Sequence, residues 1–338
     1  MVQLVYFSII IYAYDRKEYI TRAVRSAVRQ DFDRSNFEIV VVKGFTDPEI
    51  DAEFQAIGVK NVFLAEKSLG KKVAKGIRES NGEFFCLLDD DDEFEPNKLS
   101  TLRKIISNVP DVDFIHNSLI KMNEEGKITG TDSPENTKKV ISYCPSSDKA
   151  SRISKIIRHR GDWYLSAMTL RKSVTDSMID VLDETDQSID KFIFFSALNY
   201  ARRMLIIPDK LTRYRMHRST TTYNGGISDF IARRTLFFKN TVRVFGNIAG
   251  KSKGLPGEKF AECQLIQHRI NLYFISDEPN TRVKESEFLS YLGCLKFARS
   301  RYQLIWVCAY LLRKISFRLS RIIYYKFMMR IFATIIDT

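Results

Sequence analysis

Four consecutive aspartates, Asp89–Asp92, form an acidic run directly after the apolar segment Glu83–Leu88 (EFFCLL). Four adjacent carboxylates repel one another, so ionising all of them without a partner is costly. A divalent cation relieves this repulsion, and Mg²⁺ and Mn²⁺ are hard cations that prefer oxygen ligands. The alternative is a solvated acidic loop. Because the run follows a predicted buried strand, where ligands bind in open α/β sheets, we favour the metal site.

Segments with the length and apolarity of buried strands alternate with helical patterns through the first third of the chain. The predicted strands are Val5–Ile11, Phe37–Val42, Val62–Ala65 and Glu83–Leu88, and the predicted helices begin near Asp15, Lys71 and Pro96. This order is typical of an α/β fold with an open, mostly parallel sheet flanked by helices. The turns at Tyr12–Asp15 and Lys43–Asp47 should therefore share one crevice with the acidic run.

The pattern is more mixed from residue 110 to 225 and helical beyond it. Strands are predicted at Asp113–Ile120, Trp163–Leu170 and Met204–Ile207, and an apolar helix at Asp190–Tyr200. We predict three parts: an α/β domain at 1–225, a helical extension at 226–290, and basic amphipathic helices at 291–338.

Positive charge is concentrated in the last third of the chain. Residues 226–338 hold 19 Lys and Arg against 8 Asp and Glu, which gives +11 of the formal net charge of +12. Such a surface suits an anionic partner, either lipid headgroups or nucleic acid. No nucleic-acid-binding motif accompanies the charge, so we expect no nucleic-acid partner.

The C-terminal segment combines basic residues with apolar and aromatic ones. Its longest uncharged run, Tyr302–Leu312, has 11 residues, well short of the roughly 20 that span a bilayer. Lys314 and Arg318 share a helical face opposite Ile315 and Leu319, as in helices that lie in a membrane interface. The alternative is a helix packed on the α/β domain with a solvated basic face. We expect peripheral attachment to the cytoplasmic face of a membrane.

The five cysteines are odd in number and scattered, with no C-x-x-C pair. This spacing predicts neither a disulfide framework nor a zinc site, and it fits a reducing cytosol. The apolar N-terminal run has no basic start and no small-residue cleavage site, so we expect a buried strand there and no signal peptide.

Several motifs, in order and at suitable spacing, resemble those of family-2 glycosyltransferases with the GT-A (Rossmann-like) fold. They are Ser8–Arg16 (SIIIYAYDR), Ser26–Gln30 (SAVRQ), Gly70–Gly82, Leu88–Leu99 (LDDDDEFEPNKL) and Asp209–His217, which ends in YRMH. The resemblance covers about residues 5–220. It implies an inverting transferase that takes a sugar from a nucleotide-sugar donor with the help of Mn²⁺ or Mg²⁺.

Site residues follow from the resemblance, position by position. It implies that Asp89 and Asp90 contact the ribose and sugar of the donor, and that Asp91 binds the metal that bridges the diphosphate. His217 would be a further ligand of the metal or of the diphosphate. Donor contacts are also expected from the turns after the first two strands and from the third predicted helix, through Ala13, Tyr14, Asp15, Lys43, Asp47 and Lys72.

The catalytic base should be a carboxylate near the anomeric carbon, because the acceptor hydroxyl must lose a proton as it attacks. Family members carry it at the start of the helix before the closing motif, and the matching residue is Asp190, with Asp186 as second choice. An acidic residue favoured by the helix dipole is the ordinary alternative. Trp163 lies between the donor and base motifs, where its ring would either stack on an acceptor sugar or pack in the core.

The chain departs from the family pattern in the turn after the second strand, which reads Lys43-Gly44-Phe45-Thr46-Asp47 in place of paired aspartates. Tyr12 stands for the usual proline and Asp15 for the usual asparagine. Lys72-Val73-Ala74 replaces Ala-Arg-Asn, so that Lys71 or Lys72 would face the phosphates. Because the turn after the second strand departs from the family pattern, the nucleobase of the donor is left open. We favour a UDP-sugar, with a GDP-sugar as the next choice.

Two other functions compete with sugar transfer to a glycan or a lipid-linked acceptor. A sugar nucleotidyltransferase shares a similar sheet and acidic metal ligands, but it more often has a Gly-rich basic loop after the first strand. A catalytically inactive membrane-binding module would keep the fold without needing the acidic run and Asp190.

Overall fold

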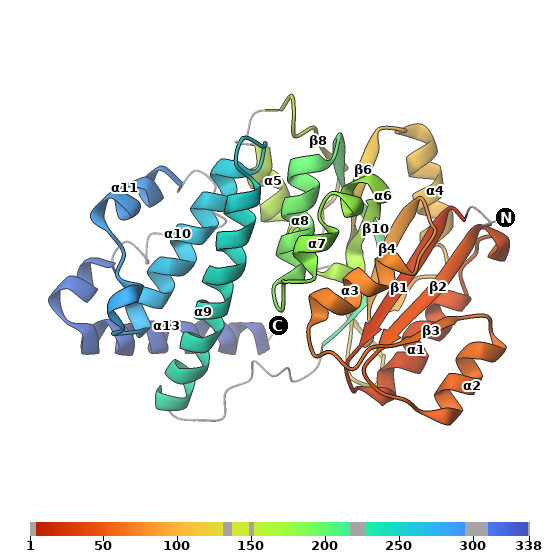
Figure 1. Cartoon of the computed structure of the whole chain (residues 1–338), viewed down its shortest axis with the longest axis horizontal. Coiled ribbons are helices and arrows are strands. Elements are labelled where there is room, and N and C mark those ends of the chain that lie inside the picture. The colour runs from red at the N-terminus through yellow and green to blue at the C-terminus, as the bar shows by residue number, and fades with distance from the viewer. Residues whose placement is uncertain (1–4, 131–136, 149–151, 217–226, 295–309, 337–338) are drawn as a thin grey trace. The chain divides into compact units, whose positions relative to one another are not determined.

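The computed structural model describes residues 5–130, 137–148, 152–216, 227–294 and 310–336. The chain divides into two compact units, Met1–His217 and Arg218–Thr338 (Figure 1). The boundary predicted at residue 225 falls within 217–226, outside the described residues.

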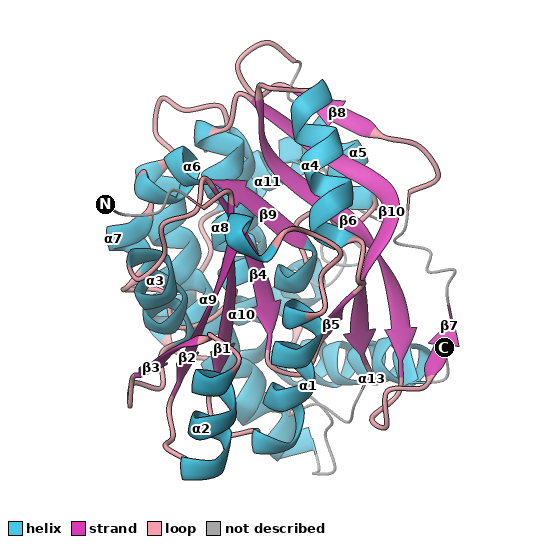
Figure 2. Ribbon diagram, turned by 90° about the vertical axis from the view of Figure 1, so that its right-hand side faces the viewer, coloured by secondary structure: helices cyan, strands magenta, loops and turns pink. Residues whose placement is uncertain are grey.

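The N-terminal unit is built on one mixed sheet with the strand order β3-β2-β1-β4-β9-β6-β10-β5 (Figure 2). The strands are β1 Phe7–Ala13, β2 Phe37–Lys43, β3 Lys60–Phe63, β4 Phe84–Asp89, β5 Glu93–Phe94, β6 Val112–Met122, β7 Ile128–Gly130, β8 Ile141–Tyr143, β9 Met168–Arg171 and β10 Arg203–Arg215. Strands β3, β2, β1 and β4 are parallel, as predicted. Strand β9 runs antiparallel between β4 and β6, so the sheet as a whole is mixed.

Helices pack around the sheet (Figure 2). They are α1 Lys17–Val28, α2 Pro48–Ala56, α3 Leu69–Arg78, α4 Lys98–Asn108, α5 Ile153–Arg158, α6 Lys172–Asp176, α7 Ile179–Leu182 and α8 Ile189–Tyr200. Successive residues of a strand point to opposite faces. Ile9 and Ile11 of β1 join the core cluster that includes residues of α1, α2 and α4. Ile10 faces α3, where a Cβ on Gly76 would lie 2.4 Å from the Ile10 side chain. Only glycine permits this close approach of α3 to β1.

Most predicted elements are present, with bounds shifted by a few residues. The predicted strand Trp163–Leu170 is wrong in its first half, because Tyr164 has a left-handed backbone (φ 64°) and Leu165–Ala167 forms a 3₁₀ turn. The strand begins only at Met168. The predicted strand Met204–Ile207 is part of the much longer β10.

The described part of the C-terminal unit is helical. Its helices are α9 Ile227–Lys251, α10 Glu258–Ile275, α11 Glu285–Cys294 and α13 Phe317–Ile336. Tyr324 of α13 is buried among Phe230, Phe238 and Phe274, which come from α9 and α10. Among the described residues, none of the helices combines the length and apolarity needed to cross a membrane.

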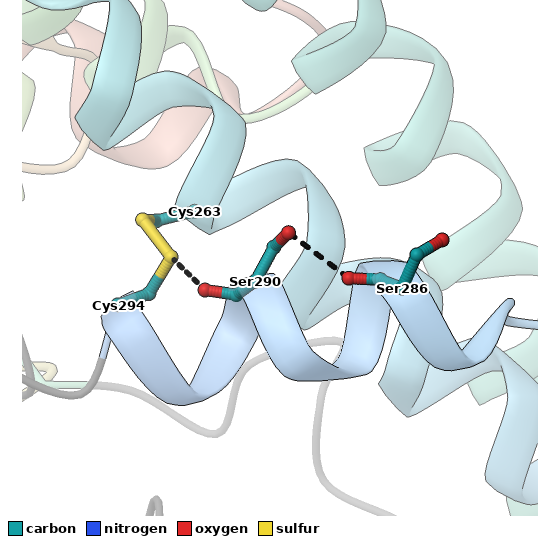
Figure 3. The surroundings of a disulfide bond; sticks show 4 residues. All are labelled: Cys263, Ser286, Ser290 and Cys294. Carbon is teal, nitrogen blue, oxygen red and sulfur yellow. Dashed lines mark hydrogen bonds between the residues drawn. A yellow bond between two sulfur atoms is a disulfide. The ribbon is translucent and has the colours of Figure 1, made fainter.

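Cys263 of α10 and Cys294 of α11 form a disulfide (Figure 3). Both residues are buried, and the Sγ of Cys294 also lies 3.3 Å from the backbone oxygen of Ser290. The prediction that the cysteines form no disulfide is therefore wrong for this pair. The two residues are 31 positions apart, and only the packing of α11 against α10 brings them together.

We expect reduction of this disulfide to lower the free energy of unfolding of the C-terminal unit by about 3–4 kcal/mol, the entropic effect of opening a loop of this length. Thermal unfolding with and without dithiothreitol measures the effect. The double variant Cys263→Ser/Cys294→Ser should be insensitive to the reductant, whereas Cys144→Ser should respond like the wild type. Alkylation of Cys263 or Cys294 in unfolded, unreduced protein would contradict the cross-link.

Candidate active site

The acidic run forms a tight turn between β4 and β5. Asp89 is the last residue of β4 and pairs in register with Tyr12 of the neighbouring β1. The N–H of Asp92 donates a 3.2 Å hydrogen bond to the backbone oxygen of Asp89. Asp90, Asp91 and Asp92 are buried, with relative exposures of 2%, 8% and 1%. The run is therefore not a solvated loop.

The guanidinium of Arg16, which follows β1, is paired with two carboxylates of the run. One of its terminal nitrogens contacts Oδ1 of Asp90, and the other contacts Oδ2 of Asp91. An arginine fork of this kind supplies charge and fixes the geometry of both carboxylates. The side chain of Arg16 is 38% exposed, whereas those of Asp90 and Asp91 are 3% and 11% exposed.

Arg215, near the end of β10, holds the turn from the other side. Its N–H donates to Oδ1 of Asp92 at 2.9 Å, its Nε to the backbone oxygen of Asp91 at 2.7 Å, and a terminal nitrogen to Glu93 at 2.7 Å. Arg215 is 2% exposed, and Arg213 is paired with Glu95. These arginines therefore fix the turn by binding acidic groups and backbone oxygens within the unit.

Ser166 contacts the acidic run directly, and Lys98 in turn holds the backbone of Ser166. The N–H of Asp89 donates to Oγ of Ser166 at 3.0 Å, and this hydroxyl lies 3.3 Å from Oδ2 of Asp89. Nζ of the buried Lys98 donates to the backbone oxygen of Ser166 at 2.7 Å and to Oγ1 of Thr212 at 3.1 Å. Nζ also lies 3.7 Å from the centre of the Phe94 ring.

Burial disfavours the charged forms of these groups. It raises the pKa of Asp89 to about 7 and that of Asp90 to about 6, with the Asp91 charge adding to the shift in both cases. Burial and the Asp91 charge also raise the pKa of Asp92 well above its usual range. Burial lowers the pKa of Lys98 to about 7. The repulsion expected from four adjacent carboxylates is thus present in the folded unit.

The chemistry of the run fits a divalent cation. All its side-chain ligands are carboxylate oxygens, and Oδ2 of Asp92 is buried without a hydrogen-bond partner. In the described part of the chain, no three His, Cys, Asp or Glu side chains converge in the arrangement of a metal site. His217, the second predicted ligand, lies outside the described residues.

The ends of the parallel strands meet beside the acidic run, as predicted. The N–H of Gly44 donates to the backbone oxygen of Ala13 at 3.2 Å, and that of Leu64 donates to the backbone oxygen of Lys43 at 2.9 Å. Nζ of the buried Lys72 donates to the backbone oxygen of Leu64 at 2.7 Å. Burial lowers the pKa of Lys72.

There is little space around Gly44, where the ends of β1, β2 and β3 meet. A Cβ at this position would lie 3.0 Å from Nζ of Lys72 and 3.0 Å from the backbone oxygen of Tyr14. Tyr14 itself is 42% exposed, with its ring centre 6.0 Å from the Lys72 nitrogen. Asp15 is also exposed.

A cavity of about 580 Å³ adjoins these strand ends. It is lined by residues 64–68, which connect β3 to α3, by Lys71 in the first turn of α3, and by Asp186, which precedes α8. Leu64 belongs both to the cavity and to the Lys72 contact. Asp186, the second choice for the catalytic base, therefore lines this cavity.

Two of the predicted donor contacts have structural partners. The buried Lys43 pairs with Asp51 at 2.7 Å and donates to the backbone oxygen of Phe45 at 2.6 Å. Asp47 caps the N-terminus of α2 and pairs with Lys17 at 2.9 Å. Lys43 and Asp47 thus shape the turn after β2, and Lys72 reaches the residue that follows β3 through its bond to Leu64.

Asp190 and Trp163 lie in one cluster at the start of α8. Oδ1 of Asp190 accepts a 2.8 Å hydrogen bond from the N–H of Lys191, and burial raises the pKa of Asp190. Nζ of Lys191 pairs with Asp162 at 2.5 Å and lies 4.4 Å from the centre of the Trp163 ring. Trp163 is 40% exposed. The segment 162–166 thus connects the Asp190 cluster to the acidic run through Ser166.

Sequence reasoning missed Arg16, Ser166 and Lys98 as parts of the site. Arg16 stood within a motif that resembles the family, but nothing in the spacing showed that it reaches carboxylates 74 and 75 positions away. Ser166 was placed on a strand, and Lys98 on the helix after the run. Their contacts depend on how β9 and α4 pack beside β4.

Comparison with known proteins agrees with this geometry. Residues 8–163 match the family model described as "Glycosyl transferase family 2". An uncharacterized glycosyltransferase of Haemophilus influenzae is 30% identical over 122 residues, which are 35% of this chain and 41% of that protein. One of Nostoc sp. is 30% identical over 115 residues, 32% of this chain and 35% of that protein. The chain thus matches less than half the length of these relatives.

Solved structures show the same architecture over most of the chain. S. aureus TarS 1–349 in complex with UDP has a TM-score of 0.57 at 18% identity, covering 87% of this chain and 80% of that one. The complex of the same protein with UDP-GlcNAc has a TM-score of 0.56 at 18% identity, covering 86% and 80%. The fold is the GT-A α/β fold, and residues 8–163 resemble the family-2 glycosyltransferases, as the motifs of the chain indicated.

Proposed function

We propose that this chain is an inverting glycosyltransferase that moves a sugar from a nucleotide-diphosphate donor to a hydroxyl of a glycan or lipid-linked acceptor. The observation that carries the proposal is the buried acidic run at the end of β4, beside the ends of β1 and β2, in a family-2 domain. In sheets of this kind, ligands bind beyond the carboxyl ends of the strands.

The donor would lie along the strand ends and in the adjoining cavity. Ala13, Tyr14 and Asp15 border this corner after β1, and Lys72 supplies a buried cation close to the exposed ring of Tyr14. Asp89 and Asp90 would contact the ribose and sugar. A UDP-sugar is the first choice and a GDP-sugar the next, since similar folds have been solved with UDP and UDP-GlcNAc.

Asp91, with His217, would hold Mn²⁺ or Mg²⁺. When bound, the cation supplies the positive charge that stabilises a departing diphosphate. The protein's own part is to keep the Asp91 backbone in place, which the hydrogen bond from Arg215 Nε to the backbone oxygen of Asp91 does.

Asp190 would act as the catalytic base. Its carboxylate takes the proton of the acceptor hydroxyl, the hydroxyl oxygen bonds to the anomeric carbon, and the bond from that carbon to the diphosphate oxygen breaks on the opposite side. This in-line displacement inverts the anomeric configuration. The exposed part of the Trp163 ring, next to Lys191, offers the acceptor sugar a stacking surface.

Release of nucleoside diphosphate from UDP- and GDP-sugars, measured with the purified full chain and Mn²⁺, tests this function. Sugar transfer to water or to an added glycan should release UDP or GDP. Release of pyrophosphate from a nucleoside triphosphate and a sugar phosphate would instead identify a nucleotidyltransferase. No release from any common UDP- or GDP-sugar would favour the inactive module.

We also propose that the C-terminal unit binds the cytoplasmic surface of an anionic membrane, where a lipid-linked acceptor would be presented. Leu311, Ile315 and Leu319 recur every four residues and are 53%, 79% and 43% exposed. Lys314 and Arg318, each adjacent in sequence to one of these residues, are exposed as well, so the basic and apolar side chains do not separate onto an exposed and a buried face. Apolar and basic side chains on one exposed surface suit a membrane interface.

Replacing Ile315 by Asp is expected to weaken binding to vesicles that contain anionic phospholipid at least about tenfold, because a charge enters the apolar stripe. Co-sedimentation of the full chain with such vesicles measures the effect. Leu236→Asp is the matched control, since Leu236 is 62% exposed on α9. Equal loss of binding in both variants, or no binding by the wild type, would contradict the proposed membrane surface.

A further inference from the structure

Arg16 holds the carboxylates that a divalent cation would use. Its fork contacts Oδ1 of Asp90 and Oδ2 of Asp91 at the same time. A cation bound to Asp91 would therefore meet a guanidinium already placed between the two carboxylates. The cation and the guanidinium, both in contact with the Asp91 carboxylate, would repel each other, most strongly in a poorly solvated site.

The side chain of Arg16 is accessible to solvent. Arg16 is the N-cap residue of α1, but its side chain makes no capping hydrogen bond. It is also more exposed than the acids it binds, at 38% against 3% and 11%. The acidic turn, which Arg215 fixes separately, would keep its shape after the guanidinium left the carboxylates.

We propose that Arg16 is the built-in counter-cation of the acidic run: it neutralises Asp90 and Asp91 in the metal-free protein and releases Asp91 when a divalent cation binds. Arg16 is thus a positioning residue that sets the affinity for the metal. The inference rests on the proposed metal-assisted transfer.

Mn²⁺ binding to the full chain without donor, followed by electron paramagnetic resonance, tests the proposal. Arg16→Ala should bind Mn²⁺ at least about tenfold more tightly than the wild type, because the competing cation is gone. Arg16→Lys should lie between the two, since lysine keeps the charge but not the fork. Arg25→Ala, which removes an α1 arginine paired with Glu53, should leave the affinity unchanged.

Thermal unfolding shows whether each variant is folded, so that a change in Mn²⁺ binding is not mistaken for loss of the fold. Arg16→Ala should unfold at a lower temperature than the wild type without metal, and Mn²⁺ should raise its Tm by more than it raises that of the wild type. Equal or weaker Mn²⁺ binding by Arg16→Ala, or no binding by either protein, would overturn the proposal. If Arg16→Ala binds Mn²⁺ more tightly than the wild type but the wild type releases no UDP or GDP, the proposed sugar transfer is contradicted and the proposal for Arg16 is not.

Discussion

Asp190→Asn is expected to lower kcat about 10²–10⁴-fold, the usual contribution of a positioned general base. The amide keeps the size and much of the hydrogen bonding of the carboxylate but cannot accept the acceptor proton. Binding of the donor should change little, because Asp190 lies in the Lys191 and Trp163 cluster and not at the strand ends. Steady-state kinetics with donor and acceptor varied separately measure both effects.

The pH dependence gives a second readout of the same residue. Catalysis needs the carboxylate form of Asp190, and burial raises its pKa above the ordinary aspartate value. Activity should therefore be full above the raised pKa and fall as the pH drops through it, so the acidic limb should lie above the range of an exposed aspartate. The part of this limb that belongs to Asp190 should disappear from the residual activity of Asp190→Asn, whereas any part due to Asp89 and Asp90, whose pKa values burial also raises, should remain.

Two further variants separate Asp190 from its neighbours. Asp186→Asn tests the second choice for the base, which lines the cavity next to β3. Asp176→Asn is a control, because Asp176 is an exposed residue of α6 that pairs with Lys172 four positions earlier. A large loss of kcat in Asp186→Asn, with Asp190→Asn near wild type, would move the catalytic role to Asp186.

The sequence was informative where the signal is local. Buried parallel strands are continuous apolar runs, so β1, β2 and β4 were located within about two residues of their bounds. The acidic run was placed correctly at the end of β4 because only the adjacent residues were needed. The helix that carries Asp190 was found for the same reason, since α8 is apolar over most of its length.

What could not be predicted depends on contacts between distant segments. The pairs of Arg16 with Asp90 and Asp91, and of Cys263 with Cys294, arise only when separate elements pack together. The strand predicted from Trp163 onward was wrong because Tyr164 adopts a left-handed backbone. Glycine usually marks such positions, and a tyrosine gives no warning.

Asp91→Ala is expected to abolish Mn²⁺ binding and to lower kcat about 10³-fold, equivalent to about 4 kcal/mol of lost transition-state stabilisation. A methyl group offers no ligand, and the remaining acids already have partners: Asp90 is paired with Arg16, Oδ1 of Asp92 accepts from Arg215, and Oδ2 of Asp89 lies 3.3 Å from the Ser166 hydroxyl. Oδ2 of Asp92 alone would not hold the metal. Asp180→Asn is the control, because the side chain of Asp180 is 96% exposed on α7. Both variants should be assayed over a series of Mn²⁺ concentrations.

The shape of that Mn²⁺ series decides between two sources of positive charge at the diphosphate. If Asp91 holds the metal, wild-type activity rises with Mn²⁺ to a plateau and Asp91→Ala stays low at every concentration. If Asp91→Ala transfers sugar at the wild-type rate with or without Mn²⁺, the metal site is wrong. The charge would then have to come from the protein itself, and Arg16, freed from one of its two carboxylates, would be the residue to replace next.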